Sequence, residues 1–130
     1  MTKNTTTNDI DALLRAQNRD TLALFREQRQ AIESAISTRE LIGADARRAL
    51  DRAKADLDDQ IVRLTPDEQH PDRFARERAM LQSKRVDVIE QEGEIDTSVW
   101  RDTEPLRREE RDNEKELSRA EREQDRNDAL

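Results

Sequence analysis

Apolar residues recur every three or four positions between Ile10 and Leu64, and no proline interrupts this stretch. Because an α-helix has 3.6 residues per turn, this spacing places the apolar side chains along one side of a helix. The remaining positions are mostly Arg, Asp, Glu and Gln, so the stripe is too narrow to enclose a globular core. A second helix has to cover it. The stripe contains Ile10, Leu13, Leu14, Leu24, Phe25, Ile32, Ile36, Ile42, Ala46, Leu50, Ala53, Leu57, Ile61 and Leu64.

The composition separates a long helix from a disordered chain. Charged residues make up 42% of the 130 positions and aromatic residues 2%, which is typical of either state. Disordered segments are usually rich in Pro and Gly, whereas this chain has three prolines and two glycines. Ala, Leu, Arg, Glu and Gln are abundant, and they are strong helix formers. We therefore expect long helices.

The charge balance and the absence of cysteine restrict the classes of function. A formal net charge of -7 argues against direct nucleic-acid binding, which requires a surplus of basic groups. No stretch approaches the roughly 18 apolar residues of a membrane span, so no membrane partner is expected. Without cysteine there is no disulfide and no thiol-ligated metal. These features favour a cytoplasmic location, or a place in a particle assembled inside the cell.

The first half of the chain is predicted to contain one helix. Residues 1–8 are polar and are expected to form a disordered N-terminus, and Asn8 or Asp9 caps a long amphipathic helix over residues 9–64. A break near residues 37–43 is the alternative, because Ser37 and Glu40 have the spacing of a capping box. The apolar residues before and after this point share one helical phase, which favours a continuous helix. Their spacing fits an 11-residue repeat, although the later part also fits heptads.

Proline and glycine divide the second half of the chain. The Pro-containing segment 65–71 predicts a turn, and residues 72–92 form a second helix. Gly93 is expected to end that helix, which gives a loop over 93–105 that contains Trp100. Residues 106–130 are predicted to be a highly charged helix or a partly disordered tail. The second helix has two apolar faces, one with Phe74, Leu81, Val88 and Ile95, the other with Ala75, Ala79, Val86 and Ile89.

If the chain reverses near residue 68, it folds into a hairpin whose two helical segments carry unequal numbers of apolar residues. The numbers of two residues that face each other across this hairpin would add up to about 136. Gly43 and Gly93 satisfy this sum, either by coincidence or because the helices approach closely there. The N-terminal half of the stripe would face the charged segment after Arg107, which offers little apolar surface. We therefore predict that this half contacts another chain. Trp100 is either a further anchor for that contact or a staple that holds the loop after Gly93 onto the long helix. The predicted interface residues are Ile10, Leu13, Leu14, Leu24, Phe25, Ile32, Ile36 and Trp100.

No group of residues predicts chemistry. His70 is the single histidine and lies between two prolines, where a polar turn residue is expected. Glu90, Glu92, Glu94 and Asp96 lack the spacing of a calcium loop, which makes a solvated helix end the simpler interpretation. Two isolated glycines cannot build a phosphate-binding loop. We expect no catalytic residue, no metal site and no cofactor, and the chain is interpreted as not being an enzyme.

The sequence thus predicts an all-α protein, an elongated helical hairpin or coiled coil that oligomerisation completes. Its partner is a protein, either a second copy or another helical chain, and a homo-oligomer is expected. The predicted role is that of a non-enzymatic structural or assembly protein, such as a scaffold, a spacer or a virion-type component. The alternative is a small regulatory adaptor or inhibitor that binds one protein partner.

Overall fold

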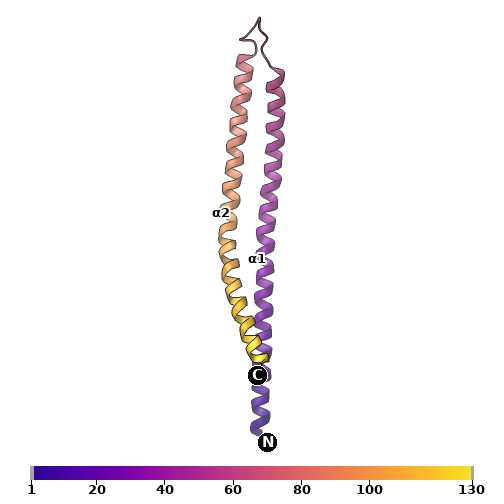
Figure 1. Cartoon of the computed structure of the whole chain (residues 1–130), viewed down its shortest axis with the longest axis vertical. Helices are drawn as coiled ribbons and strands as arrows, with labels where there is room; N and C mark the ends of the chain where they lie inside the picture. The colour runs from indigo at the N-terminus through magenta and orange to yellow at the C-terminus, as the bar shows by residue number, and fades with distance from the viewer. Residues whose placement is uncertain (1, 130) are drawn as a thin grey trace. The chain divides into compact units, whose positions relative to one another are not determined.

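The computed structural model describes residues 2–129, and side chains from residue 9 onward. It contains two helices, α1 (Thr2–Arg63) and α2 (Ala75–Asp128), which pack against each other as a hairpin (Figure 1). No strand occurs between residues 2 and 129. The prediction of an all-α helical hairpin is confirmed. A coiled-coil geometry and an oligomer remain predictions.

Helix α1 begins earlier than the sequence predicts and runs without a break. It starts at Thr2, so it includes residues 2–8, for which disorder was expected; Met1 lies outside the described residues. No proline or glycine precedes Ile10, and nothing in the sequence therefore stops the helix from extending toward the N-terminus. The helix also passes Ser37, where the capping-box pattern offered the alternative of a break.

The reversal between the helices is longer than the predicted turn. At its start, Thr65 Oγ1 donates a hydrogen bond to the carbonyl of Val62 at 2.5 Å. In its middle, the amide of His70 donates to Asp67 Oδ1 at 2.6 Å. At its end, Phe74 has a φ of 65°, which a right-handed helix cannot include. Helix α2 therefore begins at Ala75 rather than at residue 72.

Helix α2 also crosses residues 93–105, where the sequence predicts a loop, and that prediction is wrong. Gly93 is helical, and Thr97 Oγ1 donates to its carbonyl at 2.9 Å. Pro105 lies inside the helix although its ring removes one backbone hydrogen bond. A lone glycine costs a helix about 1 kcal/mol and a proline about 3 kcal/mol. Residues on both sides of this segment pack against α1 and hold it helical despite these costs.

The chain divides into two compact units, which are described separately. The hairpin unit is Thr38–Thr103, and the terminal unit combines Met1–Ser37 with Glu104–Leu130. In the hairpin unit, the seam between the helices has a seven-residue spacing on both sides. The first row consists of Gly43, Leu50 and Leu57 of α1 with Leu64 just after its end, and the second of Leu81, Val88 and Ile95 of α2 with Phe74 just before its start, all buried or half-buried.

The second apolar face of α2 has no neighbour in the hairpin unit. Val86 is 53% exposed and Ile89 is 43% exposed, and Ala75 and Ala79 are also exposed. The sequence correctly separates this face from the row that begins with Phe74, since only that row packs on α1. One face of α2 is therefore apolar without contacting α1.

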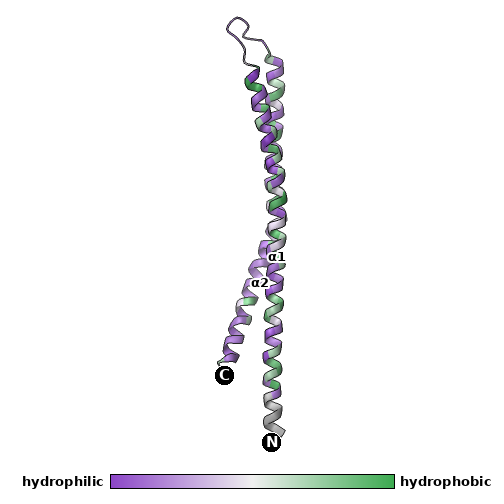
Figure 2. Ribbon diagram, turned by 90° about the vertical axis from the view of Figure 1, so that its right-hand side faces the viewer, coloured by the Kyte–Doolittle hydropathy of each residue, from purple (hydrophilic) through white to green (hydrophobic). Residues whose placement is uncertain are grey.

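In the terminal unit, a few buried residues hold α1 and α2 together. Leu22 and Ile36 of α1 and Leu117 of α2 are the buried apolar residues, and Asn113 of α2 is buried with them. In Figure 2 the C-terminal part of α2 is mostly hydrophilic, whereas α1 carries apolar positions along this region. The apolar core of the terminal unit thus comes mainly from α1.

The register of the hairpin unit differs from the predicted pairing. Arg39 pairs with Asp102 and Arg47 with Asp96, so paired residue numbers add up to 141 and 143 rather than about 136. Gly43 consequently faces Val99 and not Gly93. The turn extends to Phe74, which moves the centre of the reversal toward α2. The agreement of the two glycines with the predicted sum is therefore a coincidence.

Candidate protein-interaction surface

The structure divides the interface residues predicted on α1 into two groups. Ile36 is buried at 6% exposure, and Phe25 and Ile32 are half-buried, so these three contribute to the contact with α2. The other four are exposed by 51% to 69%. We name these four the outer stripe; they are Ile10, Leu13, Leu14 and Leu24.

The spacing of the residues explains this division. Phe25 and Ile32 are seven positions apart, and Leu22 and Ile36 are fourteen apart, which keeps them on the side of α1 that meets α2. Leu24 lies about 160° around the helix from Leu22, because each residue turns the helix by about 100°. Leu13 lies eleven positions before Leu24 and shares its side. Leu13 and Leu24 therefore lie off the row that packs within the chain, whereas Leu14, eleven positions before Phe25, lies near the side that packs.

The end of α2 explains why the first residues of the outer stripe are uncovered. Arg15 and Arg19 of α1 lie beside Gln124, Asn127 and Asp128 of α2, where they line a small polar pocket. The described part of α2 ends there, and α1 extends past it in both Figure 1 and Figure 2. Three residues of the outer stripe therefore have no α2 residue opposite them; they are Ile10, Leu13 and Leu14.

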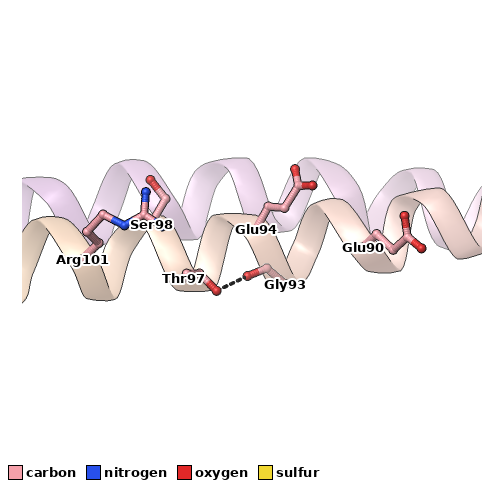
Figure 3. A pocket seen from close by; sticks show the side chains of 6 residues that line it. All are labelled: Glu90, Gly93, Glu94, Thr97, Ser98 and Arg101. Atoms are coloured by element: carbon pink, nitrogen blue, oxygen red, sulfur yellow. Dashed lines mark hydrogen bonds between the residues drawn. The ribbon is translucent and has the colours of Figure 1, made fainter.

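Trp100 lies on the surface of the hairpin unit with 65% of its area exposed. Its indole makes no hydrogen bond with any described residue, and Arg101 beside it makes no ion pair within the same part of the chain. A shallow groove along α2 lies next to these residues. Figure 3 shows its lining, which comes from one helix only: Glu90, Gly93, Glu94, Thr97, Ser98 and Arg101. Trp100 and Arg101 are thus free to contact another molecule.

A second groove lies at the seam between α1 and α2 in the terminal unit, and we name it the seam groove. Asn113 is buried there, and its Nδ2 donates a hydrogen bond to the carbonyl of Phe25 at 3.0 Å. The Oδ1 of Asn113 is buried and receives no hydrogen bond. One residue of the groove lining therefore holds a buried acceptor without a donor. Its lining consists of Phe25, Gln28, Ala31, Ile32, Glu109, Asp112, Asn113 and Glu116.

The rim of the seam groove is acidic. Glu109 and Asp112 make no ion pair with any residue in the described chain, while Glu116 pairs with Arg119 at 3.4 Å. Other carboxylates raise the pKa of Arg29 on α1. The hydrogen bond to Glu33 is the main cause, and the carboxylates of Glu33, Glu114 and Glu110 add to it. An incoming cation would meet a favourable potential at this groove.

The hairpin unit contains a buried carboxylate that the sequence reasoning missed. Glu92, interpreted as part of a solvated helix end, has a side chain that is only 6% exposed. Arg47 Nη2 lies 3.4 Å from its Oε2. Lys54 Nζ lies 3.3 Å from its Oε1, an atom that is buried and accepts no well-formed hydrogen bond. The signal was present, because Glu92 lies seven positions after Arg85 and seven before Val99, on the inward row of α2.

The four acidic residues around Gly93 point in different directions. Glu92 points inward, Asp96 pairs with Arg47 at 2.8 Å, and Glu90 and Glu94 line the groove on the outer side of α2. No group of three metal-binding side chains converges among the described residues. His70 is 66% exposed in the turn, with Nδ1 3.4 Å from Asp67 Oδ1. That the chain has no catalytic activity stays a prediction.

Comparison with known proteins gives no assignment: no family model, no curated protein and no solved structure matches this chain. In the part of the chain that the structure describes, neither helix has an apolar run long enough to cross a membrane. The exposed apolar residues and the seam groove are therefore the features of the chain that indicate a function.

Proposed function

We propose that this chain is a non-enzymatic structural or assembly protein that acts through helix–helix contacts, as a scaffold, a spacer or a component of a virion-type particle. The observation that carries the proposal is the exposure of the outer stripe. Leu13 is 69% exposed and Leu24 is 52% exposed, although both belong to a regular apolar pattern. A repeated apolar row that no described residue covers is typical of a surface that another protein covers.

The size of the outer stripe is sufficient for a specific contact. Fully burying one leucine or isoleucine side chain contributes about 1.5–3 kcal/mol. Four such side chains at half to two-thirds exposure therefore offer several kcal/mol, which association must set against the loss of translational freedom. A helix with the same apolar spacing is the partner that fits such a row, and a second copy of α1 provides one.

The inward rows support a coiled-coil geometry as part of this proposal. In the hairpin unit the seam residues recur every seven positions on α1 and on α2, which is the spacing that knobs-into-holes packing requires. Polar residues are also buried where the helices meet, among them Glu92 in the hairpin unit and Asn113 in the terminal unit. Such polar positions lower stability but favour one register over others.

The proposal is tested by size-exclusion chromatography with light scattering over a range of micromolar concentrations. The variant Leu13→Gln/Leu24→Gln should shift the chain toward the monomer without reducing its helicity by circular dichroism. Leu41→Gln is the matched control, because Leu41 is 60% exposed on α1 but lies in the hairpin unit. A wild-type chain that stays monomeric at every concentration would overturn the homo-oligomer. Capture of one defined partner by that monomer would then support an adaptor instead.

A further inference from the structure

We propose that Trp100 and Arg101 of one copy dock into the seam groove of a second copy. The inference rests on the proposed function in one respect, namely that the chain associates with itself. It adds a particular contact, which involves residues outside the outer stripe. Three properties of the seam groove match three properties of the exposed Trp100–Arg101 pair.

The first match is apolar. Phe25, Ala31 and Ile32 line one wall of the seam groove and belong to α1. Tryptophan buries about 150–250 Å² at an interface and is enriched among the residues that dominate binding energy. Trp100 is the single tryptophan of the chain, and it is 65% exposed. No other aromatic side chain described here is exposed to that degree, since Phe25 and Phe74 are half-buried.

The second match is a hydrogen bond. Asn113 is buried at 7% exposure, and its Oδ1 has no donor among the described residues. An indole offers one N–H donor and no acceptor. Because Oδ1 has almost no exposed area, Trp100 donates to it only if the Asn113 side chain turns toward the groove. A buried polar atom without a partner is costly, which favours an occupant that donates to it. Leucine or phenylalanine would fill the groove without that bond.

The third match is electrostatic and selects the occupant. Glu109 and Asp112 on the rim of the seam groove lack ion pairs, and Arg101 lacks one on the surface of the hairpin unit. When Trp100 enters the groove, the next residue along α2 brings a guanidinium near the rim. Arginine pairs with carboxylates through two parallel hydrogen bonds. The chain thus carries both halves of one complementary contact, and we assign the occupant as a second copy.

Two single variants test the two halves of the contact. Trp100→Ala removes the anchor, and Ala31→Arg blocks the groove with a large cation at a position that is exposed and therefore tolerant. Each should weaken self-association by about tenfold or more in sedimentation velocity. Ala23→Arg is the matched control, because Ala23 is exposed on α1 and does not line the groove. Trp100→Phe, which keeps the ring but loses the N–H, should give an intermediate loss.

Mixing the two variants separates a contact between copies from a contact within one chain. Trp100→Ala keeps an intact groove and Ala31→Arg keeps an intact anchor, so an equimolar mixture should associate more tightly than either alone. The emission of Trp100 should move to shorter wavelength as wild-type copies associate, and Ala31→Arg should abolish this shift. A mixture no better than its components would overturn the inference, because a contact between copies requires restoration.

The outcome also separates this inference from the proposed function. If the wild type associates and Leu13→Gln/Leu24→Gln weakens it, but Trp100→Ala and Ala31→Arg have no effect, the docking contact is wrong and the assembly role stands. If Trp100→Ala and Ala31→Arg weaken association and the outer-stripe variant does not, the docking contact holds and the outer stripe is not the assembly surface. A wild-type monomer would overturn both.

Discussion

Val99 fills the space that a side chain at Gly43 would need. A β-carbon at Gly43 would overlap Val99 Cγ2, and it would also lie 3.7 Å from Val99 Cβ. The same carbon at Gly93 would meet no atom within 4 Å. The two glycines of the chain therefore differ in role: Gly43 allows the helices of the hairpin unit to approach, whereas nothing packs on Gly93.

This difference predicts that replacement by alanine changes the free energy of unfolding in opposite directions at the two glycines. Gly93→Ala should raise the free energy of unfolding by about 0.5–1 kcal/mol, because alanine favours the helix and nothing obstructs its methyl group. Gly43→Ala has the same gain in helix propensity, but the clash with Val99 should lower the free energy of unfolding by about 1–3 kcal/mol. Urea titrations followed by far-ultraviolet circular dichroism measure both. Equal stabilisation by the two variants would contradict the close approach at Gly43.

The division of the apolar stripe of α1 predicts unequal costs for truncating two of its members. Ile36→Ala should lower the free energy of unfolding by about 2–4 kcal/mol, because Ile36 is only 6% exposed and its loss leaves a cavity. Leu24→Ala should cost less than about 1 kcal/mol at concentrations where the chain is monomeric, because Leu24 is 52% exposed. Unfolding curves at low protein concentration decide this. Similar losses for both would show that the stripe packs as one row.

The burial of Glu92 predicts that its negative charge contributes to the stability of the hairpin unit. Glu92→Gln should lower the free energy of unfolding by about 1–2 kcal/mol, since Arg47 and Lys54 then lose their shared carboxylate. The loss stays below that of a fully buried pair because the side chains of Arg47 and Lys54 are 38% and 28% exposed. Glu90→Gln, on the exposed side of α2, should change stability by less than about 0.5 kcal/mol. Thermal unfolding at low and high salt compares the two.

Pro105 predicts a stabilising substitution. It lies inside α2 and is exposed, so an alanine there would restore one backbone hydrogen bond without disturbing a buried contact. Pro105→Ala should raise the free energy of unfolding by about 1–3 kcal/mol. Amide hydrogen exchange should show the gain as slower exchange in α2 around residue 105. Unchanged exchange there would mean that the helix already compensates for the missing donor.

The sequence predicted the elements of the hairpin better than the way they pair. Periodicity identified α1 and the packing row that begins with Phe74, because helix faces follow from local spacing. The loop over residues 93–105 was wrong because Gly93 and Pro105 are local signals that packing on both sides outweighs. The pairing of Gly43 with Gly93 was wrong because register depends on the length of the turn and on side-chain fit, which are properties of two helices together.

The same contrast between local spacing and the fit of two helices applies to the candidate site. Exposure of Leu13, Leu24 and Trp100 agrees with their prediction as interface residues, although their role in binding stays a prediction. Ile36 was predicted together with them because, over a few turns, an 11-residue spacing and a heptad spacing place residues on nearly the same side of a helix. The seam groove could not be predicted, because it joins α1 and α2 around Asn113, a residue that looks like one polar position among many in a charged segment.

The ion cluster around Glu92 has a mechanical consequence. A pull along the helix axes in opposite directions would require α1 and α2 of the hairpin unit to slide past each other. Sliding by one heptad would separate Glu92 from Arg47 or from Lys54, which are themselves seven positions apart on α1. The same movement would drive Val99 away from Gly43 and against a larger residue. The contacts of the hairpin unit therefore oppose shear between its two helices.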